Sequence, residues 1–224
     1  MKNQKIISMA ALLIASLSAA QAQIIISEVD PNGSSASYGA DWFELKNTGS
    51  STVDITGWKM DDNSDSFSLA VPLRGITGIA PGLTVVFLED GAASTGDAAL
   101  DANFASAWFG GSVPAGLTLA NYGGSGVGLS SGGDAVNIFD STGTPITGVT
   151  FGATTLGATL DNTAGLNGTI SQLSVAGVNG AFSDGPETGS PGGVTPAPEP
   201  TTLALAGLSL AGLIGFRRMQ NRKD

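Results

Sequence analysis

The pattern of hydrophobic and polar positions differs between the middle of this chain and its two ends. In the middle, short apolar runs and alternating apolar and polar residues are separated by Gly, Asn, Asp and Ser. Alternation with a period of two is typical of half-buried strands, and many short strands with frequent turns are typical of sandwiches and barrels. We therefore predict an all-β sandwich. The predicted strands lie at about 24–29, 42–47, 53–55, 57–60, 67–69, 84–88, 127–129, 135–139, 146–151 and 169–174.

The strand predicted at 42–47 shows which side chains alternation should bury. Phe43 and Leu45 point to one side and should be core, while Glu44 points to the other and should face solvent or a neighbouring strand. Two stretches depart from the strand pattern. Residues 97–108 predict one inserted helix, and the Pro- and Gly-rich composition of 183–200 predicts a linker.

The N-terminal end has the pattern of a signal peptide at residues 1–22. Lys2 and Lys5 precede an apolar core at 6–17, and small residues then form a cleavage site. Signal peptidase is expected to cut between Ala22 and Gln23. The alternative, an uncleaved N-terminal transmembrane helix, is disfavoured by the shortness of the apolar core.

The C-terminal end combines three elements without a gap. A linker at 194–200 contains Pro198, Glu199 and Pro200, a hydrophobic helix is predicted at 201–216, and a basic tail follows at 217–224. The run from residue 203 to residue 216 is about 14 residues long and carries no charge, whereas a stable span usually needs about 20. The positive-inside rule places the tail on the cytoplasmic side. The basic residues that would stop transfer are Arg217, Arg218, Arg222 and Lys223.

These three elements in this order resemble the PEP-CTERM sorting signal of Gram-negative bacteria. The resemblance implies that an exosortase, a membrane enzyme, cuts near the Pro-Glu-Pro motif and passes the protein outward across the inner membrane. It also associates the protein with strains that make extracellular polysaccharide. The alternative is an ordinary C-terminal membrane anchor, transient or stable.

Composition limits what the exported part can bind. Between residues 23 and 200 the cations are Lys46, Lys59 and Arg74, against 18 acidic residues, a net charge of −15. Nucleic acid is therefore not an expected partner, because phosphate binding needs basic side chains. The chain has no His and no Cys, which excludes disulfides, Cys or His zinc sites, and nucleophilic triads. Polysaccharide, surface proteins or calcium remain as partners.

Two groups of acidic residues are candidates for chemistry. Glu28 and Glu44 lie in predicted strands and could form the carboxylate pair of a glycosidase, although backbone-bonding or solvent-facing acids are the simpler interpretation. Asp61, Asn63 and Asp65 have the 1, 3, 5 spacing of a calcium loop. The sixth and twelfth loop positions are Ser and Pro, so this is not an EF-hand, and a polar turn is the simpler interpretation.

Aromatic residues could form a platform for sugar stacking or could pack in the core. Trp42 and Trp58 are expected in the core. Tyr38, Tyr122 and Trp108 lie in predicted loops or the inserted helix, so both uses stay open for them.

Six short blocks in the middle of the chain carry a second resemblance. They are IISEV at 25–29, DWFELKNTG at 41–49, VDITGW at 53–58, IAPG at 79–82, LSSGGDAV at 129–136 and GSPG at 189–192. In this order they are similar to the lamin tail domain in its bacterial form, across about residues 23–193. The resemblance implies an immunoglobulin-like β-sandwich and carries no catalytic motif.

We therefore expect a non-enzymatic, exported cell-surface or matrix protein that acts by protein or polysaccharide contact. Two alternatives are a calcium-stabilised carbohydrate-binding module and a small glycoside hydrolase that uses Glu28 and Glu44.

Overall fold

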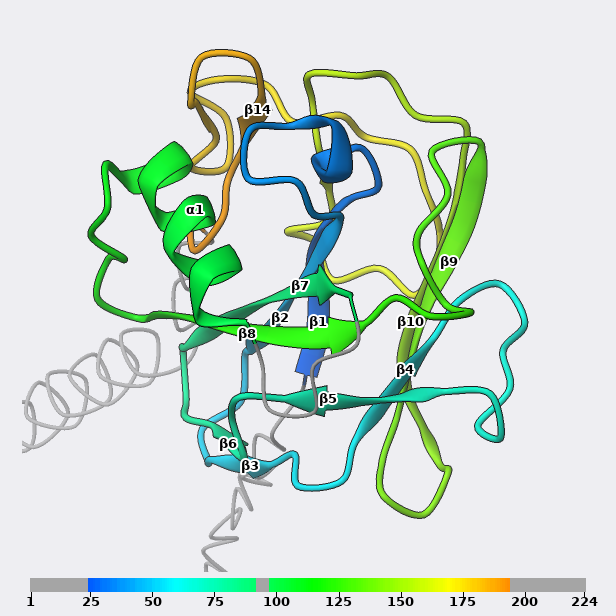
Figure 1. The fold of residues 1–224 in the computed structure, drawn as a ribbon. Coiled ribbons are helices and arrows are strands. Elements are labelled where there is room, and N and C mark those ends of the chain that lie inside the picture. The colour runs from blue at the N-terminus through cyan, green and yellow to red at the C-terminus, as the bar shows by residue number, and fades with distance from the viewer. Residues whose placement is uncertain (1–23, 92–96, 194–224) are drawn as a thin grey trace, which may run out of the picture.

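The computed structural model describes residues 24–91 and 97–193, which are built mostly of β-strands with one α-helix (Figure 1). The helix α1 spans Ala98–Phe109, and a short 3₁₀ turn spans Gly33–Ser35. The strands are β1 (Ile24–Asp30), β2 (Trp42–Asn47), β3 (Val53–Asp54), β4 (Lys59–Asp61), β5 (Val71–Arg74), β6 (Gly78–Ile79), β7 (Thr84–Asp90), β8 (Leu117–Gly123), β9 (Gly133–Phe139), β10 (Pro145–Gly152), β11 (Leu160–Asp161), β12 (Gly168–Ile170), β13 (Phe182–Ser183) and β14 (Thr188–Gly189).

Ten of these strands form one sheet in the order β11-β1-β2-β7-β8-β5-β4-β9-β10-β12. β5 pairs with β8 on one side and with β4 on the other, so it carries the sheet from one layer into the next. Apolar side chains of β1, β2 and β7 meet those of β4, β9 and β10 in one core. The all-β sandwich predicted from the alternation is therefore confirmed.

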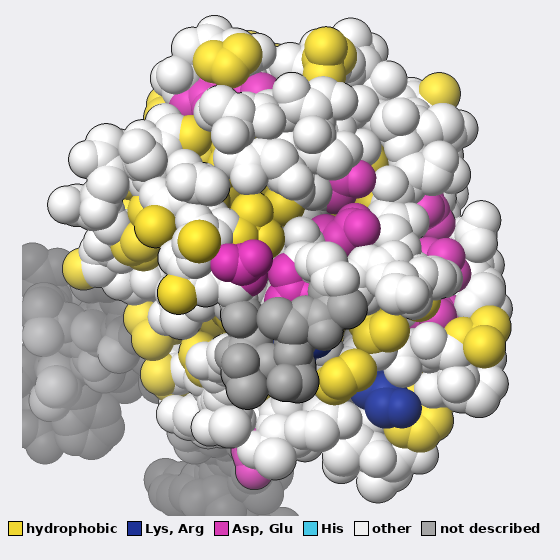
Figure 2. All heavy atoms as spheres, in the orientation of Figure 1, with side chains coloured by type: hydrophobic (Ala, Val, Ile, Leu, Met, Phe, Trp, Pro, Cys, Tyr) yellow, Lys and Arg dark blue, Asp and Glu magenta, His cyan; other side chains and the backbone are white. Residues whose placement is uncertain are grey.

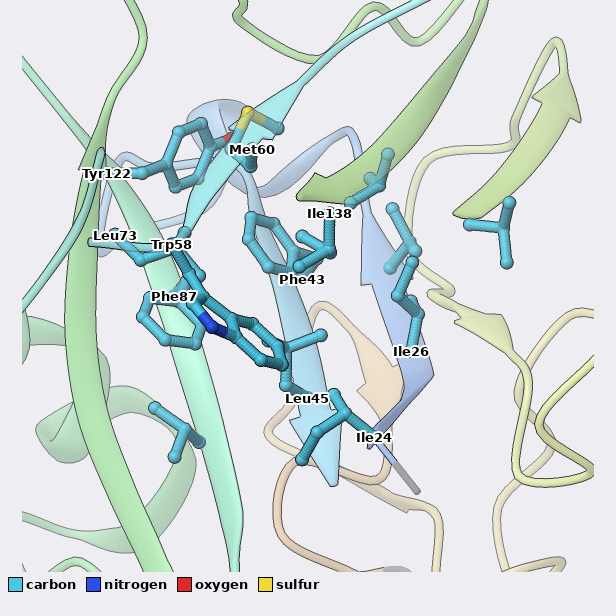
Figure 3. Packing of buried hydrophobic residues seen from close by; sticks show 14 of the residues in the cluster. Ile24, Ile26, Phe43, Leu45, Trp58, Met60, Leu73, Phe87, Tyr122 and Ile138 are labelled. Carbon is cyan, nitrogen blue, oxygen red and sulfur yellow. The ribbon is translucent and has the colours of Figure 1, made fainter. Parts of the chain in front are cut away.

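The main core contains the side chains that strand alternation selected (Figure 3). Phe43 and Leu45 are fully buried, as predicted, and the Phe43 ring stacks on Phe87 with centroids 5.4 Å apart. Trp58 also lies in this cluster, which confirms its predicted structural role. Burial of these rings and of the aliphatic side chains around them contributes to the hydrophobic driving force for folding.

A second, smaller core lies on the outer face of β2, β7 and β8, where α1 covers the sheet (Figure 1). Trp42 packs edge-on against Phe104 and Trp108 of the helix, with centroids 5.6 and 6.3 Å apart. β7 and β8 are parallel neighbours joined through α1, since parallel strands need a long crossover. β2 is consequently buried on both faces, and the expectation that Glu44 faces solvent is wrong: it is fully buried.

The helix predicted at 97–108 is confirmed as α1. The Asp97 side chain accepts hydrogen bonds from the backbone N–H groups of Ala99 and Leu100, so it is the N-cap. Gly110 ends the helix in the left-handed conformation, at φ 63°.

Several predicted strands are wrong because pairing partners far away in the chain decide them. Residues 67–69 form a turn that leaves Leu69 62% exposed, and the strand begins only at β5. Residues 127–129 are not a strand, although Val127 and Leu129 are buried in the main core. The sequence prediction omits β8, whose burial pattern does not alternate and which is held as a strand by its pairing with β5 and β7.

The predicted linker is also wrong over 183–193, because β13 and β14 pair there and several side chains are buried. The signal peptide, the linker residues 194–200, the hydrophobic helix and the basic tail lie outside the described residues. Within the described residues, no helix is long and apolar enough to cross a membrane.

Candidate functional site

The last described residues, 187–193, form a segment that we call the C-terminal strap. It lies against β1 and β2 and is held there by two glutamates of these strands, Glu28 and Glu44, which were the candidate carboxylate pair in the sequence. Ser190 donates its backbone N–H to Glu28 Oε1 at 2.7 Å and its hydroxyl to Glu28 Oε2 at 3.1 Å. Thr159 donates its hydroxyl to the same Oε1 atom. The Glu28 carboxyl therefore bonds the strap and the β11 region to β1.

Glu44 holds the next part of the strap in the same way. The Gly192 backbone N–H donates to Glu44 Oε2 at 2.5 Å, and the Ser27 hydroxyl donates to Glu44 Oε1 at 2.6 Å. Glu28 and Glu44 are direct partners in the antiparallel register of β1 and β2. The structure thus brings the predicted pair together, as adjacent anchors for one segment.

Burial makes this pair resist ionisation. Glu28 and Glu44 are both fully buried. Burial and the neighbouring Glu44 charge raise the pKa of Glu28 to about 8. Burial raises the pKa of Glu44 to about 7, against the hydrogen bonds from Ser27 and Gly192 and the Lys46 charge. Two adjacent carboxyls in a low-dielectric site favour a shared proton over two charges.

The same geometry disfavours the glycosidase interpretation of the pair. A glycosidase needs two carboxyls on either side of an open sugar cleft. Here the strap covers both groups, and each carboxyl oxygen already accepts a hydrogen bond from the protein. Their role in this structure is to hold the strap.

A second buried carboxyl pair lies beside the first and was missed by sequence analysis. The Tyr38 hydroxyl lies 3.0 Å from Asp30 Oδ2 and 2.8 Å from Glu187 Oε2, and it accepts from Trp42 Nε1 at 3.1 Å. Because a phenol has one proton to donate, it cannot satisfy two charged carboxylates at once. Burial raises the pKa of Asp30 to about 6. Burial and the Asp30 charge raise the pKa of Glu187 to about 7.

The candidate calcium residues lie at the end of β4 and in the turn that follows it, where the Asp61 carboxylate accepts hydrogen bonds from the turn itself. Asp61 is buried, and its Oδ2 accepts from the Ser64 hydroxyl and the Ser66 backbone N–H at 2.6 and 2.7 Å. Asn63 and Asp65 are exposed. Within residues 24–91 and 97–193, no group of three or more acidic side chains is arranged to hold a metal ion. A calcium site at Asp61, Asn63 and Asp65 stays a prediction.

The aromatic residues left open as a sugar platform are buried. Tyr38 lies against α1 in the smaller core, Trp108 packs edge-on against Phe182 at 5.5 Å, and Tyr122 is in the main core. None of these three rings is exposed for stacking on a sugar, so the platform interpretation is wrong for them.

Most residues that hold the strap gave no signal in the sequence. Thr159 and Tyr38 belong to stretches that look like ordinary polar loops. The exception is the block at 189–192, which contains both Ser190 and Gly192. The role of this block in binding Glu28 and Glu44 follows only from the fold, which places it against these two side chains.

Two known families match different parts of the chain. The Lamin Tail Domain matches residues 18–153, which include β1 to β10, and the PEP-CTERM protein-sorting motif matches residues 196–218. The strap lies between the two matched ranges. No curated protein matches the chain significantly. Since the first match covers more than half of the chain, the protein belongs to the lamin tail domain family, and it carries a PEP-CTERM motif for exosortase-dependent sorting to the cell surface.

Proposed function

We propose that this protein is a non-enzymatic component of the cell surface or extracellular matrix, whose immunoglobulin-like domain acts by contact with polysaccharide or other surface proteins. Signal peptidase removes residues 1–22, and an exosortase-type enzyme in the inner membrane of a Gram-negative bacterium recognises Pro198, Glu199 and Pro200. The hydrophobic helix and the basic tail hold the chain in the membrane until that step.

The observation that carries this proposal is the position of the sorting motif directly after the folded domain. The described domain extends to Gly193, and the motif begins at residue 196. Because the strap ends at residue 193, the domain is fully folded when it reaches the processing enzyme. Only residues 194 and 195 separate it from the matched motif.

The surface of the domain supports a role in contact with neutral partners. Acidic side chains are spread over the face shown in Figure 2, whereas basic side chains occupy one small area. Arg74 forms an ion pair with Asp90, which uses one of the three cations of the exported part. An anionic partner would be repelled by such a surface.

A non-enzymatic role agrees with the burial of the best catalytic candidates. Glu28 and Glu44 are enclosed and fully hydrogen-bonded, as a structural role requires. The protein has no His or Cys to serve as a base or nucleophile.

The test is intact-mass spectrometry of the protein recovered from the cell surface and from the membrane fraction. The expected surface form begins at Gln23 and ends near Pro200. A double variant Pro198→Ala and Pro200→Ala should accumulate in the membrane with its C-terminal end intact. Val194→Ala, which lies before the matched sorting motif, is the control and should be processed normally. Surface protein that still reaches Asp224 would contradict the sorting mechanism.

A further inference from the structure

A groove of about 240 Å³ with both polar and apolar walls lies between the two outermost strands of the ten-stranded sheet, β11 and β12. We call it the seam groove. The side chains that matter for the argument below are Asp161, Thr163, Leu166, Ser171, Gln172 and Asn179. They come from the end of β11, the loop that leads to β12, and the segment after β12.

The walls of the seam groove are fixed by hydrogen bonds that do not involve a ligand. Asn162 is 2% exposed and donates its side-chain amide to the carbonyl oxygens of Ile26 and Leu166, at 2.6 and 3.0 Å. Its own Oδ1 accepts from the Leu166 backbone N–H at 3.0 Å. This buried amide clamps the loop after β11 to β1.

The opposite wall is tied to the first through Asp161. Asp161 Oδ2 accepts from the Asn179 amide at 2.7 Å, and Asp161 Oδ1 accepts from the Thr163 backbone N–H at 2.8 Å. The groove is thus formed before anything binds, which removes much of the ordering cost of binding.

The chemistry of the lining is that of uncharged donors and acceptors around one carboxylate. Neither Lys nor Arg lines the groove. Within the described residues, the hydroxyl groups of Thr163 and Ser171 make no hydrogen bond, and the Gln172 amide donates only to the Leu173 carbonyl, at 3.0 Å. Hydroxyl and amide groups both donate and accept, so together they suit a ligand that carries several hydroxyls.

Three apolar residues, Ala164, Leu166 and Ile170, complete the lining. Leu166 lines the groove and is 56% exposed, so it offers an aliphatic surface beside the polar groups. Small-molecule sites combine apolar surface with a few placed polar groups in this way.

We propose that the seam groove binds a neutral sugar unit of an extracellular polysaccharide, an assignment that rests on the surface role proposed above. A protein partner is disfavoured by size, because stable protein interfaces bury about 800 Å² per partner, whereas a groove of about 240 Å³ has room for one small ligand unit. Anionic sugars are disfavoured because the groove holds a carboxylate and no cation.

The experiment uses the processed protein, purified from the surface of producing cells, and oligosaccharides released from the matrix of the same strain. Ion exchange separates these oligosaccharides into neutral and anionic fractions, and calorimetric titration measures the binding of each. The double variant Ser171→Ala and Gln172→Ala removes two exposed groove side chains and should weaken binding of the neutral fraction at least tenfold. Ser125→Ala, an exposed serine outside the groove lining, is the matched control and should bind like the wild type.

Three results would overturn the assignment: no binding of the neutral fraction, stronger binding of the anionic fraction, or equal binding by the groove variant and the wild type. Thermal melts of the variants check that folding is intact. Surface delivery is measured separately, by the mass of the surface form. A groove variant that is sorted normally but loses sugar binding supports both proposals, whereas failed sorting of the wild type contradicts only the surface role.

Discussion

Glu28 and Ser190 are 162 positions apart in the chain, yet the Glu28 carboxyl accepts both the backbone N–H and the hydroxyl of Ser190. This contact closes the domain, because it bonds the last segment of the fold to its first strand. The segment that closes the domain also leads to the sorting motif at 196–218. The segment whose contact with β1 closes the domain is therefore separated from the sorting motif by only a few residues of the chain.

The buried carboxyls predict an unusual dependence of stability on pH. The pKa values of Glu28, Glu44, Asp30 and Glu187 are raised to about 8, 7, 6 and 7, from ordinary values of 4.5, 4.5, 3.8 and 4.5. The folded state therefore holds protons that the unfolded state releases. The stabilisation is complete below about pH 4 and is lost as pH rises to about 8. Chemical denaturation at pH 5, 7 and 8.5 should give a falling free energy of unfolding, and a rise over this range would contradict the prediction.

Replacing one member of the central pair should reduce this pH dependence. Glu44→Gln keeps the shape and the bond from Gly192, and the Ser27 hydroxyl can turn to accept from the new amide. Because the variant cannot place a second negative charge beside Glu28, it should be more stable than the wild type at pH 8.5, by about 1–3 kcal/mol. At pH 5 the two should be similar. The exposed Asp54→Asn is the control, and its curve should keep the slope of the wild type.

Gly189 has no free space for a side chain. A Cβ atom there would lie 2.9 Å from Glu28 Oε1, from Thr159 Cγ2 and from the Trp108 ring. Gly189→Ala should therefore lower the free energy of unfolding by about 1–3 kcal/mol, the usual cost of overpacking. Gly152→Ala is the matched control, because a Cβ at Gly152 meets no atom within 4 Å. Equal denaturation midpoints for the two variants would show that the strap does not pack as described.

Tyr38 is predicted to matter through its hydroxyl group. Tyr38→Phe removes the partner of Asp30, Glu187 and Trp42 Nε1 while keeping the ring that packs on Phe104 at 5.0 Å. Buried polar groups without partners cost about 1–3 kcal/mol, so denaturation should show a loss of that size. Tyr122→Phe should lose less, because the Tyr122 hydroxyl makes one long contact of 3.4 Å to Glu89. The reverse order of the two variants would refute the proposed network.

Local pattern was enough to predict several elements and their buried faces. Alternation around Phe43 and Leu45 identified β2 and its core face, and the pattern over residues 97–108 predicted the helix α1. Prediction from local pattern failed where a strand depends on pairing partners that are distant in the chain. β8 is a strand because β7 and β5 lie beside it, and Leu69 is exposed because no partner strand reaches residues 67–69.

The sequence by itself determined the class of the fold, the family and the sorting motif, because these depend on alternation, short blocks and the order of segments within the chain. Only the tertiary structure decided what Glu28 and Glu44 do. Their position in strands was readable, but their burial depends on the strap from residues 187–193 and on α1 covering the other face of β2. Burial and hydrogen bonding in three dimensions set the protonation and role of a carboxyl group, and neighbouring residues in the chain do not.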